Sequence, residues 1–493
     1  MQSIWTGLKR GFSVGLGFRL RVRRGFRLGV RRGFRLGFVL CASLCAPSGV
    51  LHAMSLRAAY EAALRHDPAI RMAAQDRISG EQAAIVGRAA LLPQVNYTAS
   101  TAQNFNVRTQ QTSAGAREED INFRTQSDSL TLRQPLFSID AFKRFQLGQV
   151  QAANAGVVFQ SREQDLLLRL AETYGGVLVA ARQLETVDAQ IRAAQEQRAL
   201  SDRMFAFGEG TRTEVLESKA RMELLQAART EAVSGLEISR GALLLIVGAE
   251  HRQAVERLGA DACPSAERCP VIRQLPAWLE EYRSEGGEIT ALTTRWLDRV
   301  ETGNPELRAA RNSIEQAGLE LQRLRGQHAP RLDLTANLGR SSSESVLLLN
   351  QQFLNRGIGL QFNLPIYAGG AVSAQVAQAA AALERARIDH DGKRKRILHD
   401  IERLTIQIVQ AMRRFEALKQ SEASLELLVT ATRKSVLGGY RIPLNVLEAQ
   451  AQLAQTRGEM FRTLVQISVS EIRLRSLAGP LAADEFERYA PLL

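Results

Sequence analysis

The side chains best suited to metal chemistry form three adjacent His-Asp pairs, at His66-Asp67, His390-Asp391 and His399-Asp400. Such pairs could in principle serve a metal-dependent hydrolase, in which imidazole and carboxylate groups hold an ion that activates water. Their setting favours a simpler interpretation, since all three pairs fall on expected solvated helix faces or turns. The sequence also contains no phosphate-binding loop, no HExxH and no nucleophile elbow. We therefore predict that the chain is not an enzyme and holds no metal and no cofactor.

Cys263 and Cys269 are a second group with possible chemistry. Five residues separate them, in a segment rich in charged residues, proline and glycine. In an exported protein two cysteines this close usually pair, so the spacing predicts a disulfide. A metal site is the alternative, but it would need more ligands than the nearby His251 can supply.

Charged residues also recur in a ten-residue stretch that occurs twice, as GEGTRTEVLE at 208–217 and GYRIPLNVLE at 439–448. Each copy places a glycine-bearing turn between two proline-free amphipathic segments, which predicts the tip of a helical hairpin. Arg441 and Glu448 in the second copy could form ion pairs between chains. Partly exposed ion pairs contribute only about 0–1 kcal/mol each, which suits a gate that a docking partner opens. The alternative is a solvated turn of no consequence.

The sequence around these two stretches is duplicated as well. Equivalent residues lie 237 positions apart near the start of each copy, as for Pro68 and Pro305, and 231 apart at the tips, as for Gly208 and Gly439. The first copy carries about seven extra residues between positions 93 and 135. An offset that holds over so many positions indicates an internal structural repeat.

Long helices are predicted for most of each copy. No proline occurs between residues 136 and 263, and a helix over 141–205 would be roughly 100 Å long at 1.5 Å per residue. A second long helix is predicted over 371–437, and shorter helices return over 214–246 and 444–477. Helices this long cannot be buried in a compact domain, so we expect them to pack side by side. Coiled-coil seams are predicted at Leu167, Leu170, Tyr174, Val177, Ala181, Leu184 and Ile191, with Asp188 as an interruption, and at Ile397, Ile401, Leu404, Ile408, Ala411, Phe415, Leu418 and Leu425.

Alternation of apolar and polar residues predicts two strands in each copy, over 94–106 and 122–134, and over 331–340 and 354–364. Each strand has one apolar and one polar face, which is typical of transmembrane strands between lipid and a wet lumen. An ordinary soluble hairpin with one wet face fits the pattern equally well. Four strands cannot close a membrane barrel, so several chains would have to share one.

The N-terminal segment accounts for most of the positive charge. Ten Lys or Arg residues and no acid lie in the first 37 positions, so residues 54–493 carry only +3 of the net +13. This balance argues against a nucleic-acid partner. A basic stretch, a short apolar run and a small residue at position 53 predict a secretory signal peptide over 1–53. The alternatives are a start codon placed too far upstream or a basic arm. No apolar stretch beyond it is long enough for a transmembrane helix.

These patterns define the expected domain organisation. The first repeat covers 54–248 with its tip at 207–214, and the second covers 296–479 with its tip at 437–445. An inter-repeat segment occupies 249–295, and a tail occupies 480–493. The fold class is mainly α with a β portion, in which duplicated coiled-coil hairpins accompany four membrane strands per chain.

This plan resembles the TolC family of outer-membrane channel-tunnels, on the tip motif and on repeat openings that end in His-Asp-Pro and Gly-Asn-Pro. Neither Cys41 nor Cys45 follows the small residue that a lipidated cysteine needs, so we expect no lipid anchor. In this respect the chain is more similar to type I secretion channels than to lipidated efflux components. The resemblance implies a homotrimer in the outer membrane, with a twelve-stranded barrel and a helical tunnel in the periplasm. Its implied partners are membrane lipid, a periplasmic adaptor, an inner-membrane ABC transporter and an unfolded protein in transit, such as a repeat toxin of the cyclolysin or hemolysin kind.

The resemblance also implies roles for tip residues. Arg441 takes the place of the arginine at the periplasmic entrance gate, with Glu448 as an acidic partner. Asn445 stands where a second acid is usual, while its first-copy counterpart Glu214 keeps an acid. Gly208 and Gly439 match the tip glycines at which an adaptor docks. A drug or metal efflux duct is the alternative within this fold, and a periplasmic coiled-coil scaffold without a pore is the alternative outside it.

Overall fold

The computed structural model describes residues 54–113, 115–258, 279, 282, 289–343, 351–438 and 444–481. The chain divides into a unit of residues 1–51 and a unit of residues 52–493, and all described residues belong to the second. The predicted signal peptide, Cys263, Cys269, Gly439 and Arg441 lie outside the described residues. The disulfide therefore stays a prediction.

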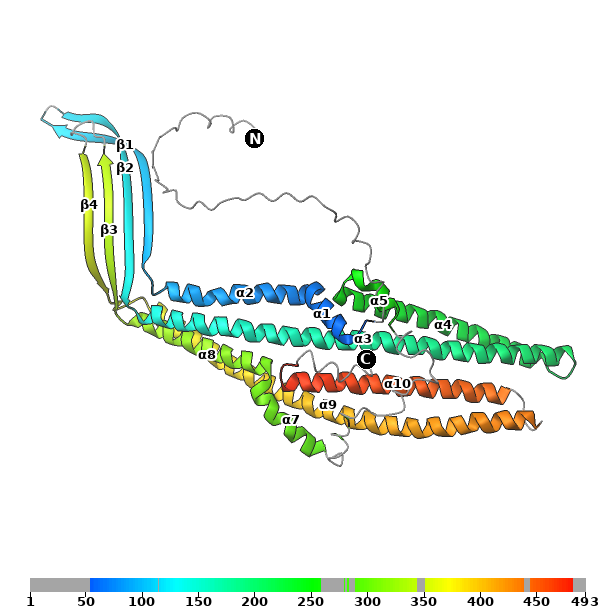
Figure 1. Cartoon of the computed structure of the whole chain (residues 1–493). Coiled ribbons are helices and arrows are strands. Elements are labelled where there is room, and N and C mark those ends of the chain that lie inside the picture. The colour runs from blue at the N-terminus through cyan, green and yellow to red at the C-terminus, as the bar shows by residue number, and fades with distance from the viewer. Residues whose placement is uncertain are drawn as a thin grey trace, which may run out of the picture. The chain divides into compact units, whose positions relative to one another are not determined.

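The described chain runs through the same order of elements twice (Figure 1). The first pass contains α1 (Leu56–His66), α2 (Pro68–Ala89), β1 (Gln94–Thr112), β2 (Gly115–Phe137), α3 (Ile139–Ala206) and α4 (Arg212–Val247). The short elements η1 (Ala249–His251) and α5 (Arg252–Glu256) follow. The second pass contains α7 (Ile289–Gly303), α8 (Pro305–Arg325), η4 (Gly326–His328), β3 (Arg331–Ser343), β4 (Gln351–Asn363), α9 (Ala371–Leu437) and α10 (Leu444–Ala478).

The repeat is visible in how its equivalent helices begin. Asp67 caps α2 by accepting hydrogen bonds from the backbone N–H groups of Ala69 and Ile70, and Pro68 occupies the first helical position. Asn304 caps α8 in the same way, with Pro305 next to it. A proline costs nothing at this position because its missing N–H would have no partner within the helix. The duplicated prolines therefore mark duplicated helix starts.

The long helices pack along their predicted seams. α3 contacts α2, α4, α8 and α10, and α9 contacts α7, α8 and α10. The seam residues of both helices are buried or partly buried, and all except Leu425 belong to hydrophobic clusters. The main cluster is formed largely by α1, α3, α4, α9 and α10. The buried Tyr174 also donates a hydrogen bond of 2.8 Å to the carbonyl of Met54, and burial raises the pKa of its hydroxyl. The coiled-coil prediction is thus confirmed for the described helices.

The four strands form one antiparallel sheet in the order β1-β2-β3-β4. The first hairpin is longer than predicted, because pairing continues from Val107 opposite Asp120 to Thr112 opposite Gly115. The alternating pattern disappears there, since both faces carry mostly polar residues while the backbone bonds continue. The second hairpin also differs at its ends, with β3 reaching Ser343 and β4 spanning Gln351–Asn363.

Among the described residues, none of the helices combines the length and the apolar character needed to span a bilayer.

Candidate functional site: the sheet and the helical tips

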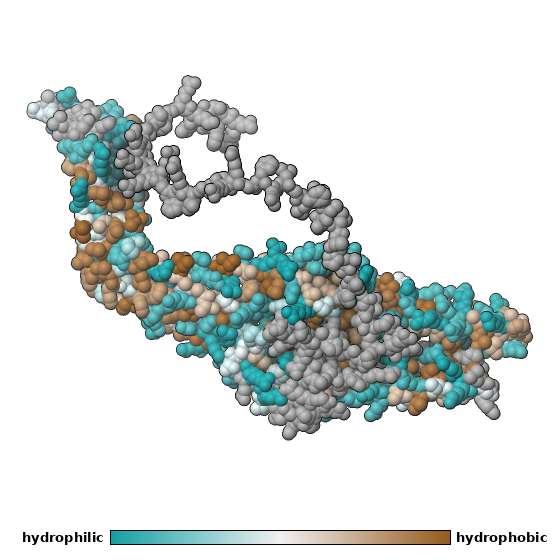
Figure 2. Space-filling model, viewed as in Figure 1, coloured by the Kyte–Doolittle hydropathy of each residue, from teal (hydrophilic) through white to brown (hydrophobic). Residues whose placement is uncertain are grey.

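The strand register gathers the apolar residues of all four strands on one face of the sheet. One row across the sheet contains Val95, Leu132, Ala336 and Ile358, and neighbouring rows pair Tyr97 with Leu130, Leu334 with Leu360, and Leu332 with Phe362. Many of these side chains are exposed to solvent, Ile358 by 83% and Phe362 by 65%. Hydrophobic residues accordingly gather over the strands in Figure 2. An uncovered apolar face of this kind marks a membrane or protein interaction surface, which argues against the soluble-hairpin alternative.

The two outer strands of this sheet each have one neighbour among the described strands. β1 pairs with β2 alone, and β4 pairs with β3 alone. Each therefore presents a row of backbone N–H and C=O groups along its outer edge. Such edges recruit further strands unless they are covered or interrupted. The sheet is thus able to extend on both sides by adding strands of another chain.

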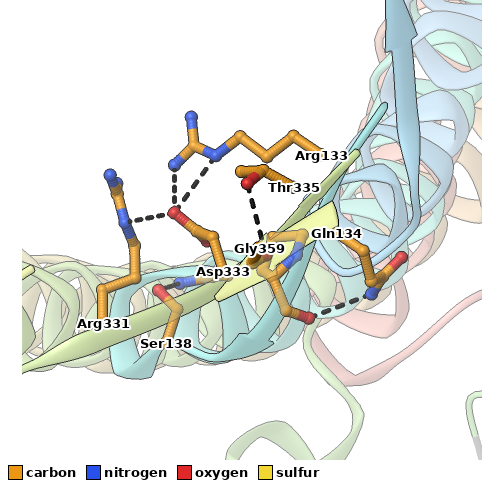
Figure 3. A network of polar contacts seen from close by, with 9 residues as sticks. Arg133, Gln134, Ser138, Arg331, Asp333, Thr335 and Gly359 are labelled. Atoms are coloured by element: carbon orange, nitrogen blue, oxygen red, sulfur yellow. Dashed lines mark hydrogen bonds and ion pairs between the residues drawn. The ribbon is translucent and has the colours of Figure 1, made fainter. Parts of the chain in front are cut away.

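The opposite face of the sheet carries a polar network close to the helices (Figure 3). Asp333 of β3 is almost fully buried and accepts hydrogen bonds from Nε and Nη2 of Arg133 on β2, at 3.2 and 2.9 Å. Arg331 adds an ion pair to the same carboxylate, at 3.0 Å. Gln134, which pairs with Leu334 and so lies on the apolar side of the sheet, donates from its side chain to the carbonyl of Leu91, which precedes β1. These contacts fix strands of both hairpins relative to each other where the sheet meets the helices.

The first helical tip is a tight turn between α3 and α4. Gly208 adopts a φ of +79°, a backbone conformation that side chains with a Cβ rarely take. Glu214, a predicted gate residue, forms a capping box with Thr211, because each side chain accepts a hydrogen bond from the other residue's backbone N–H. The tip also exposes Phe205 and Phe207, the latter by 80%. This aromatic pair was not among the predicted site residues, although two phenylalanines beside a tip glycine are a sequence signal for it.

The described part of the second tip begins at α10. Asn445 lies half-buried in its first turn, and Glu448 lies one turn further along. The Oε1 atom of Glu448 is 3.7 Å from Nη1 of Arg221 on α4, so the pair joins return helices of the two repeats. Glu448 and Arg221 line a cavity of about 440 Å³ that is bordered by α3, α4 and α10. Its lining is rich in amides, contributed by Gln190, Gln197, Gln452 and Gln455.

Together, the uncovered apolar sheet and the duplicated long helices define the class of membrane channel subunits. A model for a family described as outer membrane efflux protein matches residues 59–249 and 296–480, one stretch in each repeat. The chain belongs to this family, and the resemblance to TolC proteins is thereby confirmed. It is an outer-membrane protein whose helical part lies in the periplasm.

Two relatives and one solved structure show how far the similarity extends. The chain is 33% identical to alkaline protease secretion protein AprF of Pseudomonas aeruginosa, over 89% of this chain and 87% of that relative. It is 32% identical to proteases secretion protein PrtF of Dickeya chrysanthemi, over 92% and 94% of the two chains. The CmeC outer membrane channel of Campylobacter jejuni has the same fold, with a TM-score of 0.68 at 14% identity over 88% of this chain and 89% of that one.

Proposed function

We propose that this chain is the outer-membrane duct of a type I secretion system, through which an unfolded protein leaves the cell. The observation that carries this proposal is the uncovered apolar face of a sheet joined to two long helical hairpins. Contact with lipid would anchor that sheet, and the helices would continue the duct into the periplasm. The family consists of transport components, which supports the further inference that the chain has no catalytic activity.

The exported cargo is a protein. The resemblance pointed to a repeat toxin of the cyclolysin or hemolysin kind, and the names of AprF and PrtF support the export of proteases. The chain, an ABC transporter and an adaptor should therefore restore secretion in a strain without its own outer-membrane duct. The measurement is the amount of a repeat toxin or protease in the medium. Restored drug resistance without secreted protein would instead favour the efflux alternative.

The working assembly is a homotrimer. The β1 edge of one copy would pair with the β4 edge of the next, so that three sheets close into twelve strands. Closure would remove every open edge, which a four-stranded sheet cannot do alone. Trimers that resist detergent and dissociate on heating are the expected result of outer-membrane extraction. A monomer that makes no holes in lipid would contradict the proposal.

The helical tips form the periplasmic entrance of this duct. Gly208 and Gly439 mark the docking sites for the adaptor, and the exposed Phe205 and Phe207 supply apolar contact area at the first of them. Arg441, Asn445, Glu448 and Glu214 are the gate residues in this proposal. The observed distance of 3.7 Å between Glu448 and Arg221 supports a gate closed by weak ion pairs, which partner binding could open.

The gate assignment can be tested by conductance. Arg441→Ala removes a charge from the entrance, and we expect a higher single-channel conductance in planar lipid bilayers. The matched control is Arg77→Ala, which removes an exposed arginine that pairs with Glu81 on α2. Equal conductance for both variants in well-folded trimers would count against the gate.

A further inference from the structure

Three side chains that can bind a metal converge at the end of α1 and in η1, outside the sheet and the tip residues described above. His66 is the last residue of α1, whereas Glu250 and His251 belong to η1, directly after α4. The Oε1 atom of Glu250 lies 2.8 Å from Nε2 of His66 and 3.4 Å from Nε2 of His251. One ligand atom from each residue lies within 4.8 Å of the other two. Two imidazoles and a carboxylate thus face a common point.

The backbone around this cluster holds both segments in place. Gly248 has a φ of +98°, and a Cβ built on it would lie 2.9 Å from Cγ of His66. Only glycine therefore lets η1 approach the His66 ring. On the other side, Asp67 caps α2 and forms an ion pair of 3.1 Å with Arg169 of α3. The ligands are consequently presented by a backbone that is fixed without a metal, which reduces the ordering cost of binding.

The donor set selects a chemical class of ion. Imidazole suits zinc, copper, iron and nickel, and two histidines with one glutamate are a known set for a zinc ion that keeps a position open for water. Each of the three side chains is at least one-third exposed, so an ion could reach the cluster from solvent. Calcium and magnesium are disfavoured, because they prefer sites built from oxygen atoms.

We propose that His66, Glu250 and His251 form a binding site for a divalent transition metal, with Zn²⁺ as the fitting ion. The site joins the end of α1 to the segment that leaves the first repeat. A metal bound only by the folded chain stabilises it by mass action. The ion therefore links the end of α1 to η1 and stabilises this contact, independently of what the duct exports.

The test is Zn²⁺ binding to the full chain, purified without a histidine tag and stripped with a chelator. Equilibrium dialysis with metal analysis should find one ion per chain that depends on this cluster, and Zn²⁺ should raise the thermal unfolding midpoint. His66→Ala, Glu250→Gln and His251→Ala should each weaken binding by more than about tenfold, since losing even an outer-shell partner costs 10–100-fold. Each variant should also abolish the thermal shift.

Matched controls separate this site from general metal binding. His399→Ala removes an exposed histidine of α9, and Glu237→Gln removes an exposed glutamate of α4. Both should bind Zn²⁺ like the unchanged chain. Co²⁺ absorption supplies a readout of coordination, and its visible bands should disappear in the His66 and His251 variants while circular dichroism shows unchanged helix content. Absence of Zn²⁺ binding to the unchanged chain, or equal binding by the ligand variants, would overturn the proposal.

Discussion

The two helical hairpins of the repeat use opposite chemistry at equivalent positions. In the first hairpin, Ile191 of α3 is buried in a small cluster with Met222 of α4. The offset of 231 residues that relates the two tips places Glu422 of α9 at the position of Ile191. An apolar contact in one copy is therefore replaced by a carboxylate in the other.

The buried Glu422 of the second hairpin contacts an arginine of α10. Nε of Arg457 on α10 donates to Glu422 at 2.8 Å, and its Nη2 donates to Glu426 at 2.5 Å. Arg457 and Glu422 are both buried, and the residue equivalent to Arg457 in the first hairpin is Gln226. Duplication has thus preserved the lengths of the helices but not these contacts between them. At these positions the second hairpin buries charge where the first buries an apolar side chain.

The largest expected effect comes from breaking this buried charge group. Arg457→Gln introduces the residue of the first hairpin and removes the buried cation that contacts Glu422. We expect a loss of about 3–5 kcal/mol in the free energy of unfolding, because removing one member of a buried ion pair is strongly destabilising. Urea unfolding followed by circular dichroism measures this change in the free energy of unfolding.

Arg414→Gln is the matched control, since Arg414 is an exposed arginine that pairs with Glu459 between the same two helices at 3.4 Å. Its loss should cost no more than about 1 kcal/mol. Equal effects of the two substitutions would mean that burial does not distinguish these ion pairs.

Introducing the first-hairpin residues at all three positions should restore the free energy of unfolding that Arg457→Gln loses. The triple variant Glu422→Ile, Glu426→Gln and Arg457→Gln replaces the buried pair and the partly exposed Glu426 by the residues found at 191, 195 and 226. The variant introduces one apolar residue and two amides and removes both members of the buried ion pair together, and such a replacement is often neutral, or stabilising by about 1–4 kcal/mol where the new residues are apolar and well packed. The same urea experiment should therefore give a stability at or above that of the unchanged chain. A triple variant as unstable as Arg457→Gln would show that the two hairpins do not share one packing geometry.

The comparison also shows what the sequence could predict. The limits of α9 follow from a proline-free apolar stripe that ends at glycines, and the predicted span of 371–437 is the observed one. The outer part of β1 was missed because residues 107–112 carry no alternation, and backbone pairing leaves no other trace in a sequence. The Arg221–Glu448 pair and the His66–Glu250–His251 cluster were missed for another reason. Arg221 lies far from Glu448 along the chain, and His66 lies far from the adjacent Glu250 and His251, so spacing carries no signal for these contacts.

A smaller effect is expected at the first tip, at the capping box of Thr211 and Glu214. Thr211 and Glu214 correspond to Ile442 and Asn445 in the second copy, and isoleucine has no oxygen with which to cap. Thr211→Ala should cost about 1 kcal/mol, as for other lost caps. Hydrogen exchange of the first amides of α4 should accelerate, whereas Thr213→Ala, which leaves the box intact, should change it little. Unchanged exchange in Thr211→Ala would indicate that the turn at Gly208 alone fixes the start of α4.

The smallest loss of stability is expected at the exposed ion pair between α3 and α4 of the first hairpin. Asp188 of α3 lies 2.7 Å from Arg229 of α4, and the equivalent residues of the second hairpin are Lys419 and the buried Met460. Half of the Arg229 side chain is exposed, so Asp188→Asn should cost only about 0.2–1 kcal/mol. The cost should shrink further at about 1 M salt, because salt screens exposed pairs far more than buried ones. Arg457→Gln should keep most of its cost in the same salt. A salt response shared by both variants would mean that the second hairpin admits water to its charges, and the contrast between the hairpins would then lie in residue type alone.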